Sequence, residues 1–180
     1  MSSGFAARVA AERSDVELAA GGDDVAFGRL VARHQAEMAR IAYVIIGDQT
    51  LAQDATQSAW IAAWLRLRSV REPAKVRSWL LSIAANEARQ LLRRRGRVAI
   101  VEIDPEVTAS PRNEASTAIA RLDLVRALAG LAPEDRALLA LRYVAGLDAA
   151  ELGAATGRSA SGTRARLSRL TARLRQELDR

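Results

Sequence analysis

Two stretches of helical apolar spacing, separated by a segment that cannot continue a helix, constrain the fold of this chain more than any other feature. Within residues 23–97 and again within residues 122–178, apolar side chains recur every three or four positions, on one side of an α-helix. The intervening VAIVEIDPEVTASPRN holds two prolines and several acids, a composition typical of a linker. The sequence therefore predicts an all-α fold of two helical domains joined by an irregular linker over residues 98–121.

Composition favours helices over strands. Alanine and leucine dominate and aromatic residues make up only 4% of the chain, whereas strands prefer β-branched and aromatic residues. We expect residues 1–22 to form a tail and one short helix, and His34, the only histidine, to lie at the surface or at a helix edge. Helices are predicted over residues 16–20, 23–46, 51–67, 76–95, 116–130, 134–144, 149–156 and 159–178.

Several classes of protein are disfavoured by what the sequence lacks. No apolar run approaches the roughly 18 residues that cross a bilayer, the first residues have no signal-peptide pattern, and cysteine is absent. We therefore expect a cytoplasmic protein with no membrane insertion and no metal. An enzyme is disfavoured because His34 has no neighbouring nucleophile, acid–base pair or ligand set. No cofactor and no small-molecule substrate are expected.

Basic residues are gathered into two blocks. Residues 65–97 carry ten basic and two acidic side chains, and residues 136–180 carry nine and four. The stretches before the blocks, residues 14–64 and 98–135, each carry seven acids and three bases. This distribution is the expected footprint of a polyanionic partner such as nucleic acid.

The C-terminal basic block has the spacing of a helix-turn-helix. A short helix after Asp148 leads to the turn Gly157-Arg158 and to a second helix that Ser159 can cap. The second helix has one apolar side, made by Leu167, Leu170, Leu174 and Leu178. Its opposite side has small residues between two flanks of arginine: Ser161, Ala165, Ser168 and Ala172 lie between Arg166, Arg169 and Arg173 on one flank and Arg164 and Arg175 on the other.

Such a helix face suits a DNA groove. Small residues let the backbone approach the groove floor, while the arginines reach phosphates on both sides. A solvated amphipathic helix, with its arginines merely pointing to water, is the alternative for this helix taken alone.

The first domain carries a second candidate surface. LAQDATQSAWIAAW, residues 51–64, reads as a core helix with at least one of Trp60 and Trp64 inside. The following VRSWLLSIAANEARQLLRRR sets arginines, Trp79 and Asn86 beside an apolar stripe, a combination that suits unstacked bases and a phosphate backbone. The terminal arginines alone are also typical of a helix C-terminus.

Together these segments resemble the bacterial sigma-70 family of RNA polymerase sigma factors, specifically the compact extracytoplasmic-function (ECF) group. DDVAFGRLVARHQ resembles region 2.1, GDQTLAQDATQSAWIAAW resembles region 2.2, and VRSWLLSIAANEARQLLRRR resembles regions 2.3–2.4. LAGLAPEDRALLALRYVAGLDAAELGAATGRS resembles region 4. The resemblance extends from Asp23 over nearly the whole chain, with a divergent linker.

The resemblance implies a factor that recruits RNA polymerase core to promoters, with region 2 in residues 23–97 and region 4 in residues 122–178. It implies partners in the β′ clamp helices and β flap of the polymerase, in promoter DNA, and possibly in an anti-sigma factor. The implied core contacts are Asp54, Gln57, Ser58 and Ile61, where Ser58 replaces an acid of the family. The implied −10 contacts are Arg77, Trp79, Asn86, Arg89 and Arg93, after a base-capturing loop at Val70–Lys75.

The resemblance also implies that the second helix of the C-terminal pair reads the −35 element. Its implied contacts are Ser159, Ser161, Arg164, Ala165, Arg166, Ser168, Arg169 and Arg173, with Arg164 and Ser168 toward bases and Ser159, Arg166, Arg169 and Arg173 toward phosphates. Gly162-Thr163 lies one residue later than the glycine-threonine pair of the family, so Thr163 stands where a buried valine is usual.

One alternative function remains at this point. A helix-turn-helix regulator could bind operators without being a polymerase subunit, but residues 23–97 would then have no role. We therefore expect an alternative sigma factor without enzymatic activity.

Overall fold

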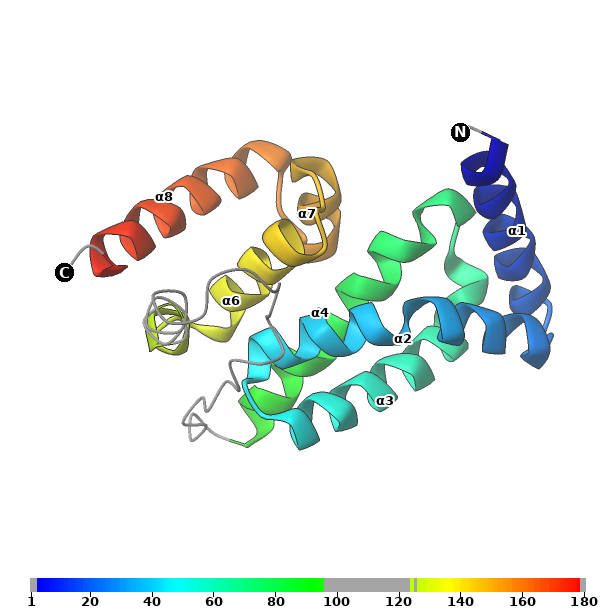
Figure 1. The fold of residues 1–180 in the computed structure, drawn as a ribbon, viewed down its shortest axis with the longest axis horizontal. Helices are drawn as coiled ribbons and strands as arrows, with labels where there is room; N and C mark the ends of the chain where they lie inside the picture. Colours follow the sequence, from blue (N-terminus) through cyan, green and yellow to red (C-terminus); the bar gives the residue numbers. More distant parts are fainter. Residues whose placement is uncertain (1–2, 96–123, 125, 179–180) are drawn as a thin grey trace.

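The computed structural model describes residues 3–95, 124 and 126–178, and the side chains from residue 10 onward (Figure 1). Every regular element in these ranges is a helix, so the predicted all-α fold is confirmed. The predicted linker, residues 98–121, and the beginning of the predicted helix at 116–130 lie outside the described residues. Helices α1 and α8, the first and last of the described helices, lie toward opposite ends of the long axis (Figure 1).

The first domain is built from helices α1 (Ser3–Ala20), α2 (Asp24–Ile46), α3 (Gln49–Arg66) and α4 (Val76–Arg94). Helices α2, α3 and α4 pack against one another, and α1 packs against α2. The core at their centre is aliphatic and includes Leu30, Met38, Ile41, Ile45, Leu80 and Leu81. Two short 3₁₀ turns, η1 (Leu67–Ser69) and η2 (Pro73–Lys75), connect α3 to α4.

Local side chains set the helix boundaries in this domain. The carboxylate of Asp23 accepts a hydrogen bond from the backbone N–H of Ala26 at 2.9 Å and caps α2. Gly47 then ends α2 with a φ of 82°, a left-handed conformation that favours glycine. Asp48 caps α3 by accepting from the N–H of Leu51 at 2.8 Å.

Helix α1 is longer than the sequence predicted, since it begins at Ser3 rather than at Val16. Its buried Asp15 accepts hydrogen bonds from Arg29 at 2.7 Å and from Arg33 at 3.2 Å, both on α2. Glu12 lies 2.6 Å from Nε2 of His34, which is only 4% exposed. The prediction that His34 lies at the surface is therefore wrong, because the extended α1 covers it.

The second domain contains helical residues 126–129, α6 (Pro133–Leu139), α7 (Ala149–Thr156) and α8 (Ala160–Leu178). Pro133 occupies the first turn of α6, as expected, and a π-helical turn, η4 (Ala140–Val144), continues it. The fully buried Leu147 and Leu152 belong to its core.

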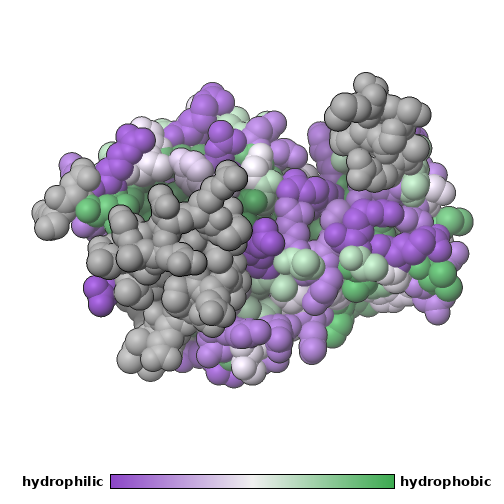
Figure 2. Space-filling model, viewed as in Figure 1, coloured by the Kyte–Doolittle hydropathy of each residue, from purple (hydrophilic) through white to green (hydrophobic). Residues whose placement is uncertain are grey.

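The two domains contact each other. Helix α6 packs against α2 and α4, and α7 packs against α4, so the buried residues of both domains form one continuous apolar cluster. The face shown in Figure 2 is largely hydrophilic, with small apolar patches toward its edges. Among the described residues, none of the helices combines the length and the apolar character that a bilayer crossing needs.

Candidate nucleic-acid and polymerase interfaces

Helices α7 and α8 form the predicted helix-turn-helix, and several local contacts fix the turn. Asp148 accepts from the N–H groups of Ala150 and Glu151 at 2.8 and 2.9 Å, while the Glu151 side chain accepts from the N–H of Asp148. This capping box starts α7. Gly157, with a φ of 67°, ends it. A Cβ added to Gly153 would lie 2.6 Å from the carbonyl oxygen of Arg158, so only glycine fits at this position of α7, which packs against the turn.

Helix α8 begins with a serine cap and buries most of the predicted apolar side. The hydroxyl of Ser159 accepts from the N–H of Gly162 at 3.1 Å. Leu167, Leu170 and Leu174 are buried, whereas Leu178, the last leucine of the predicted apolar side, is 42% exposed. The packed stripe ends with Leu174, and the last helical turn projects beyond it.

Thr163 of α8 is fully buried, yet its hydroxyl has no hydrogen-bond partner in the described structure. The residue thus occupies an apolar position, where burial of an unpaired hydroxyl is unfavourable.

The predicted −35 residues lie on the outer side of α8 and differ in whether their side chains are paired with other residues. Arg166 is the most restrained: its Nε donates to Asp135 of α6 at 2.6 Å. Arg173 donates to Glu177 on the same helix at 3.0 Å. The remaining predicted residues are exposed: Ser159, Ser161, Arg164, Ala165, Ser168 and Arg169.

The four predicted polymerase contacts share one face of α3. All four are exposed, with Ile61 at 64%: Gln57 and Ser58 each lie three or four residues from both Asp54 and Ile61. Leu65, one turn further along, is 74% exposed and extends this face. Leu65 was not among the predicted contacts, although its position four residues after Ile61 was a signal that could have identified it.

The two tryptophans of α3 lie at different depths. Trp60 is buried and donates its indole N–H to Gln35, whereas Trp64 is 39% exposed. Both rings make edge contacts with Phe27. This arrangement agrees with the expectation that at least one tryptophan belongs to the core.

The polar residues of α4 are engaged in contacts within the chain. Arg77 donates from Nε to Glu37 at 3.0 Å and from Nη2 to the carbonyl oxygen of Ala145 at 2.8 Å. Arg89 donates to the side-chain oxygen of Asn86 at 3.0 Å, and burial lowers the pKa of this guanidinium. Nε of Arg89 is buried without a hydrogen-bond partner, and burial of this unpaired donor costs free energy.

The C-terminal end of α4 also reaches the second domain. Nη1 of Arg93 lies 3.4 Å from the carboxylate of Glu134 on α6. The sequence patterns gave no indication of Glu37, Glu134, Asp135 or Ala145 as partners of the predicted DNA contacts, because each partner lies far along the chain.

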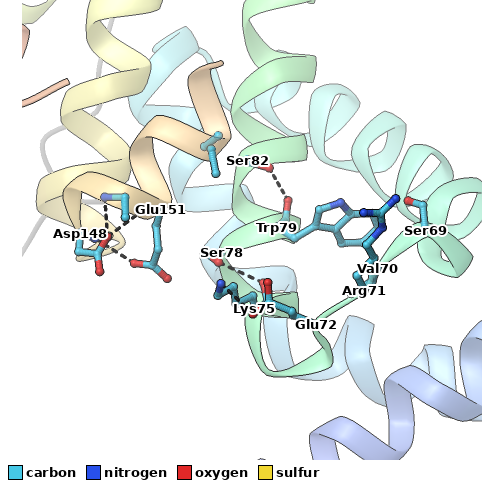
Figure 3. Close-up of a pocket in the computed structure, with 13 residues that line it drawn as sticks. Ser69, Val70, Arg71, Glu72, Lys75, Ser78, Trp79, Ser82, Asp148 and Glu151 are labelled. Atoms are coloured by element: carbon cyan, nitrogen blue, oxygen red, sulfur yellow. Dashed lines mark hydrogen bonds and ion pairs between the residues drawn. The ribbon is translucent and has the colours of Figure 1, made fainter. Parts of the chain in front are cut away.

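A cavity of about 530 Å³ lies between the predicted base-capturing loop and α7 (Figure 3). Arg71, Lys75 and Trp79 line it from the first domain, and Asp148 and Glu151 line it from the second. Lys75 pairs with Glu72 at 2.8 Å. That hydrogen bond is the main cause that raises the pKa of Lys75, with smaller contributions from Glu151 and Asp148.

Comparison with known proteins identifies the family. Residues 30–98 match the family model of Sigma-70 region 2, and residues 121–174 match that of Sigma-70, region 4. RNA polymerase sigma factor CnrH of Cupriavidus metallidurans is 30% identical, over 94% of this chain and 95% of its own length. ECF RNA polymerase sigma factor SigM of Mycobacterium tuberculosis is 32% identical, over 91% and 84%. The chain belongs to the ECF group of the sigma-70 family.

One relative is much longer than this chain, and a solved structure shares its fold. The chain spans only 42% of a sigma factor of Xanthomonas campestris, RfaY, to which it is 32% identical. The structure of CnrH in complex with the cytosolic domain of CnrY is similar with a TM-score of 0.70 and 27% identity, over 94% of this chain and 97% of that one. The ECF factor described here is thus an alternative sigma factor of transcription initiation, as its sequence predicted.

Proposed function

We propose that this sigma factor divides its contacts among three helices, each of which presents a separate surface. Helix α3 docks on the β′ clamp helices of RNA polymerase core through Asp54, Gln57, Ser58 and Ile61, and region 4 docks on the β flap. The observation that carries this proposal is the row of exposed residues on α3. A regulator that worked without polymerase would have no use for a polar face with Ile61 and Leu65 exposed to water.

Helix α4 and the loop before it hold the opened −10 element. Unpairing bases costs a few kcal/mol, which the protein recovers by binding the extruded base and the single strand. Arg77, Asn86, Arg89 and Arg93 supply the strand contacts, and the partly buried Trp79 supports the base pocket from below.

Helix α8 reads the −35 element in the major groove. The exposed Arg164 and Ser168 contact base edges, flanked by the small Ser161 and Ala165 that allow a close approach. Phosphate contacts hold the helix in register. These are made by Ser159, Arg166, Arg169 and Arg173.

The protein acts in the cytoplasm as a binding factor, without a catalytic residue or cofactor of its own. The two DNA contacts cooperate because core polymerase holds both domains on one promoter, which raises their effective concentration. CnrH, the relative of similar length, is bound by the cytosolic domain of CnrY in its structure. An anti-sigma factor is accordingly a further proposed partner of this chain.

Reconstituted transcription tests the proposed function. Purified chain is added to sigma-free core polymerase on candidate promoter templates, and transcripts are mapped from their 5′ ends. We expect promoter-specific transcripts that are lost when Asp54 and Ile61 are both changed to arginine, whereas a Glu17→Gln control remains active. Sequence-specific DNA binding without any polymerase-dependent transcript would instead favour a regulator that acts alone.

A further inference from the structure

Arg77, at the beginning of α4, is held by a carboxylate on the neighbouring helix α2. Its Nε donates to Oε2 of Glu37 at 3.0 Å, and its Nη2 donates to the other oxygen of the same carboxylate. Two such hydrogen bonds fix both the position and the plane of a guanidinium, whereas a single bond leaves the plane free to turn. Glu37 therefore sets the direction in which Arg77 can donate.

The backbone beneath both side chains is anchored in the core. Glu37 precedes Met38 on α2 and Arg77 follows Val76 on α4, and both Met38 and Val76 are fully buried. The side chains of Arg77 and Glu37 themselves are 44% and 26% exposed. Because an ion pair this exposed adds little to stability, its main effect is on the direction of Arg77 rather than on the fold.

Arg77 also reaches a third acceptor while Glu37 holds it. Its Nη2 donates to the carbonyl oxygen of Ala145 at 2.8 Å. This oxygen belongs to an uncharged peptide group, and the acceptor atoms on the edges of DNA bases are likewise uncharged. The Ala145 oxygen thus marks a position from which a neutral acceptor can bind the oriented guanidinium.

The carboxylate of Glu37 also offsets the positive charge of Arg77. A phosphate that approached this guanidinium would meet a carboxylate already bound to it, and the two negative charges would repel each other. An acceptor on a base edge carries no charge, so it avoids this repulsion and requires only a donor that points in the right direction. The pair therefore favours a base over a phosphate.

We propose that Glu37 orients Arg77 toward a base of the opened −10 strand, so that Arg77 discriminates among bases instead of binding a phosphate. This inference rests on the proposed function of α4. Glu37 is a positioning residue that acts through Arg77, and the ligand of Arg77 is a ring nitrogen or carbonyl oxygen of an unpaired base.

Binding of single-stranded DNA by the holoenzyme tests this assignment. The probes are a fluorescent strand with the −10 region of a promoter that the holoenzyme transcribes, and a set of strands in which each base of that region is replaced in turn. The ratio of dissociation constants measures discrimination at each position, and the salt dependence of binding reports phosphate contacts. We expect Arg77→Ala to reduce discrimination at one position about five- to tenfold, with little change in salt dependence.

Glu37→Gln removes the charge of the carboxylate and one of its two acceptors. We expect it to reduce discrimination at the same position about three- to tenfold, because Arg77 is no longer immobilised in advance. The released guanidinium should bind a phosphate, so the slope of log Kd against log salt should steepen by about 0.7. When Arg77→Ala is already present, Glu37→Gln should leave discrimination unchanged. The control Glu17→Gln makes the same charge change on α1 and should alter neither measurement.

Glu37→Asp separates direction from charge. It keeps a carboxylate on a side chain that is shorter by one methylene, so it should reduce discrimination without steepening the salt dependence. Full discrimination by either Glu37 variant, or a loss from Glu37→Gln that persists alongside Arg77→Ala, would overturn the inference. So would an Arg77→Ala variant that loses salt dependence but keeps discrimination. These outcomes leave the proposed function intact, which is overturned instead if the wild-type chain supports no promoter-specific transcription with core polymerase.

Discussion

The two helices proposed to contact DNA differ in how their arginines are held. On α4, Arg77, Arg89 and Arg93 are each engaged by another group of the chain, and two of those groups belong to the other domain. On α8, Arg164 and Arg169 are exposed and have no ion pair within the described structure, whereas Arg166 pairs with Asp135 and Arg173 with Glu177. The proposed base contact Arg164 is therefore free to enter a groove, whereas each of these arginines of α4 must first exchange its partner.

This difference matches the two tasks. Duplex DNA at a −35 element presents its groove without rearrangement, so a preformed helix suffices. A single strand at the −10 element exists only after the duplex opens, so the arginines of α4 are needed only at that later stage. The following variants test what holds α8 in this state and what stabilises the first domain, which carries α4.

The largest effect is expected from Gly153→Ala, which should disturb the packing of α7 against the turn before α8 and leave the residues of α4 unchanged. The new Cβ would press against backbone at Arg158, and backbone cannot move aside as a flexible side chain can. We expect a loss of about 2–3 kcal/mol in the free energy of unfolding, measured by urea titration with circular dichroism. Transcription from a promoter that depends on its −35 element should fall more than tenfold.

Gly162→Ala is the matched control for this glycine. Its Cβ would meet only the Ser159 hydroxyl, at 3.1 Å, so stability should change by less than about 1 kcal/mol. Equal losses from both substitutions would show that the close packing of α7 on the turn does not limit stability.

Two neighbouring arginines of α8 compare a free side chain with a restrained one. Arg164→Ala should relax discrimination among −35 sequences, at a cost of about 1–3 kcal/mol for the preferred sequence. Arg166→Ala should weaken binding to all sequences similarly and should reduce the salt dependence of binding, because a phosphate contact is lost. Competition binding with a panel of −35 duplexes at two salt concentrations distinguishes them, and the opposite pattern would exchange their assigned roles.

Local signals explain how much of the molecule could be predicted. Asp23, Gly47 and Asp48 mark helix ends through contacts with residues at most four positions away, so the boundaries of α2 and α3 were predicted within two residues. The α7–turn–α8 unit follows in the same way from short-range spacing, whereas the polymerase contacts on α3 came only from the resemblance to a family. The resemblance to a family then supplied the order of the two domains and their joint function.

Distant contacts explain what could not be predicted. The burial of His34 depends on Glu12 and an extended α1, and no periodicity connects residues on two separate helices. Arg77 and Ala145 lie 68 positions apart, and Arg93 and Glu134 lie 41 apart, so the sequence could identify candidate DNA contacts but not what occupies them. The predicted linker lies outside the described residues, so it stays a prediction.

Asp15→Asn tests how much the polar contacts between α1 and α2 stabilise the first domain. Burial acts to raise the pKa of Asp15, but hydrogen bonds and attraction from Arg29 and Arg33 outweigh it and lower the pKa overall. A lowered pKa means that the carboxylate stabilises the fold above its unfolded pKa of 3.8 and loses this effect as the pH falls through the folded value. We expect the variant to lose about 1 kcal/mol at pH 7.

The pH dependence provides the check. The difference in urea midpoint between wild type and Asp15→Asn should shrink from pH 7 to pH 3. Glu17→Gln removes an exposed pair with Arg13 on the same helix and should have an effect below about 0.5 kcal/mol. A pH-independent difference would mean that Asp15 acts through packing rather than charge.

The smallest effect is expected from Thr163→Val, which should strengthen α8 without changing what it reads. The hydroxyl of Thr163 is buried without a partner, and valine keeps its shape while removing the desolvation cost, for a gain of about 0.5–1 kcal/mol. Thr171→Val is the matched control, since that hydroxyl donates to the carbonyl oxygens of Leu167 and Ser168. Urea titration should give a higher free energy of unfolding than wild type for Thr163→Val, and an equal or lower one for Thr171→Val. Because Thr163 is buried, its replacement should leave the −35 preference unchanged. A loss of stability at Thr163 would mean that its hydroxyl finds an acceptor in solution, and that α8 depends on polar restraint as α4 does.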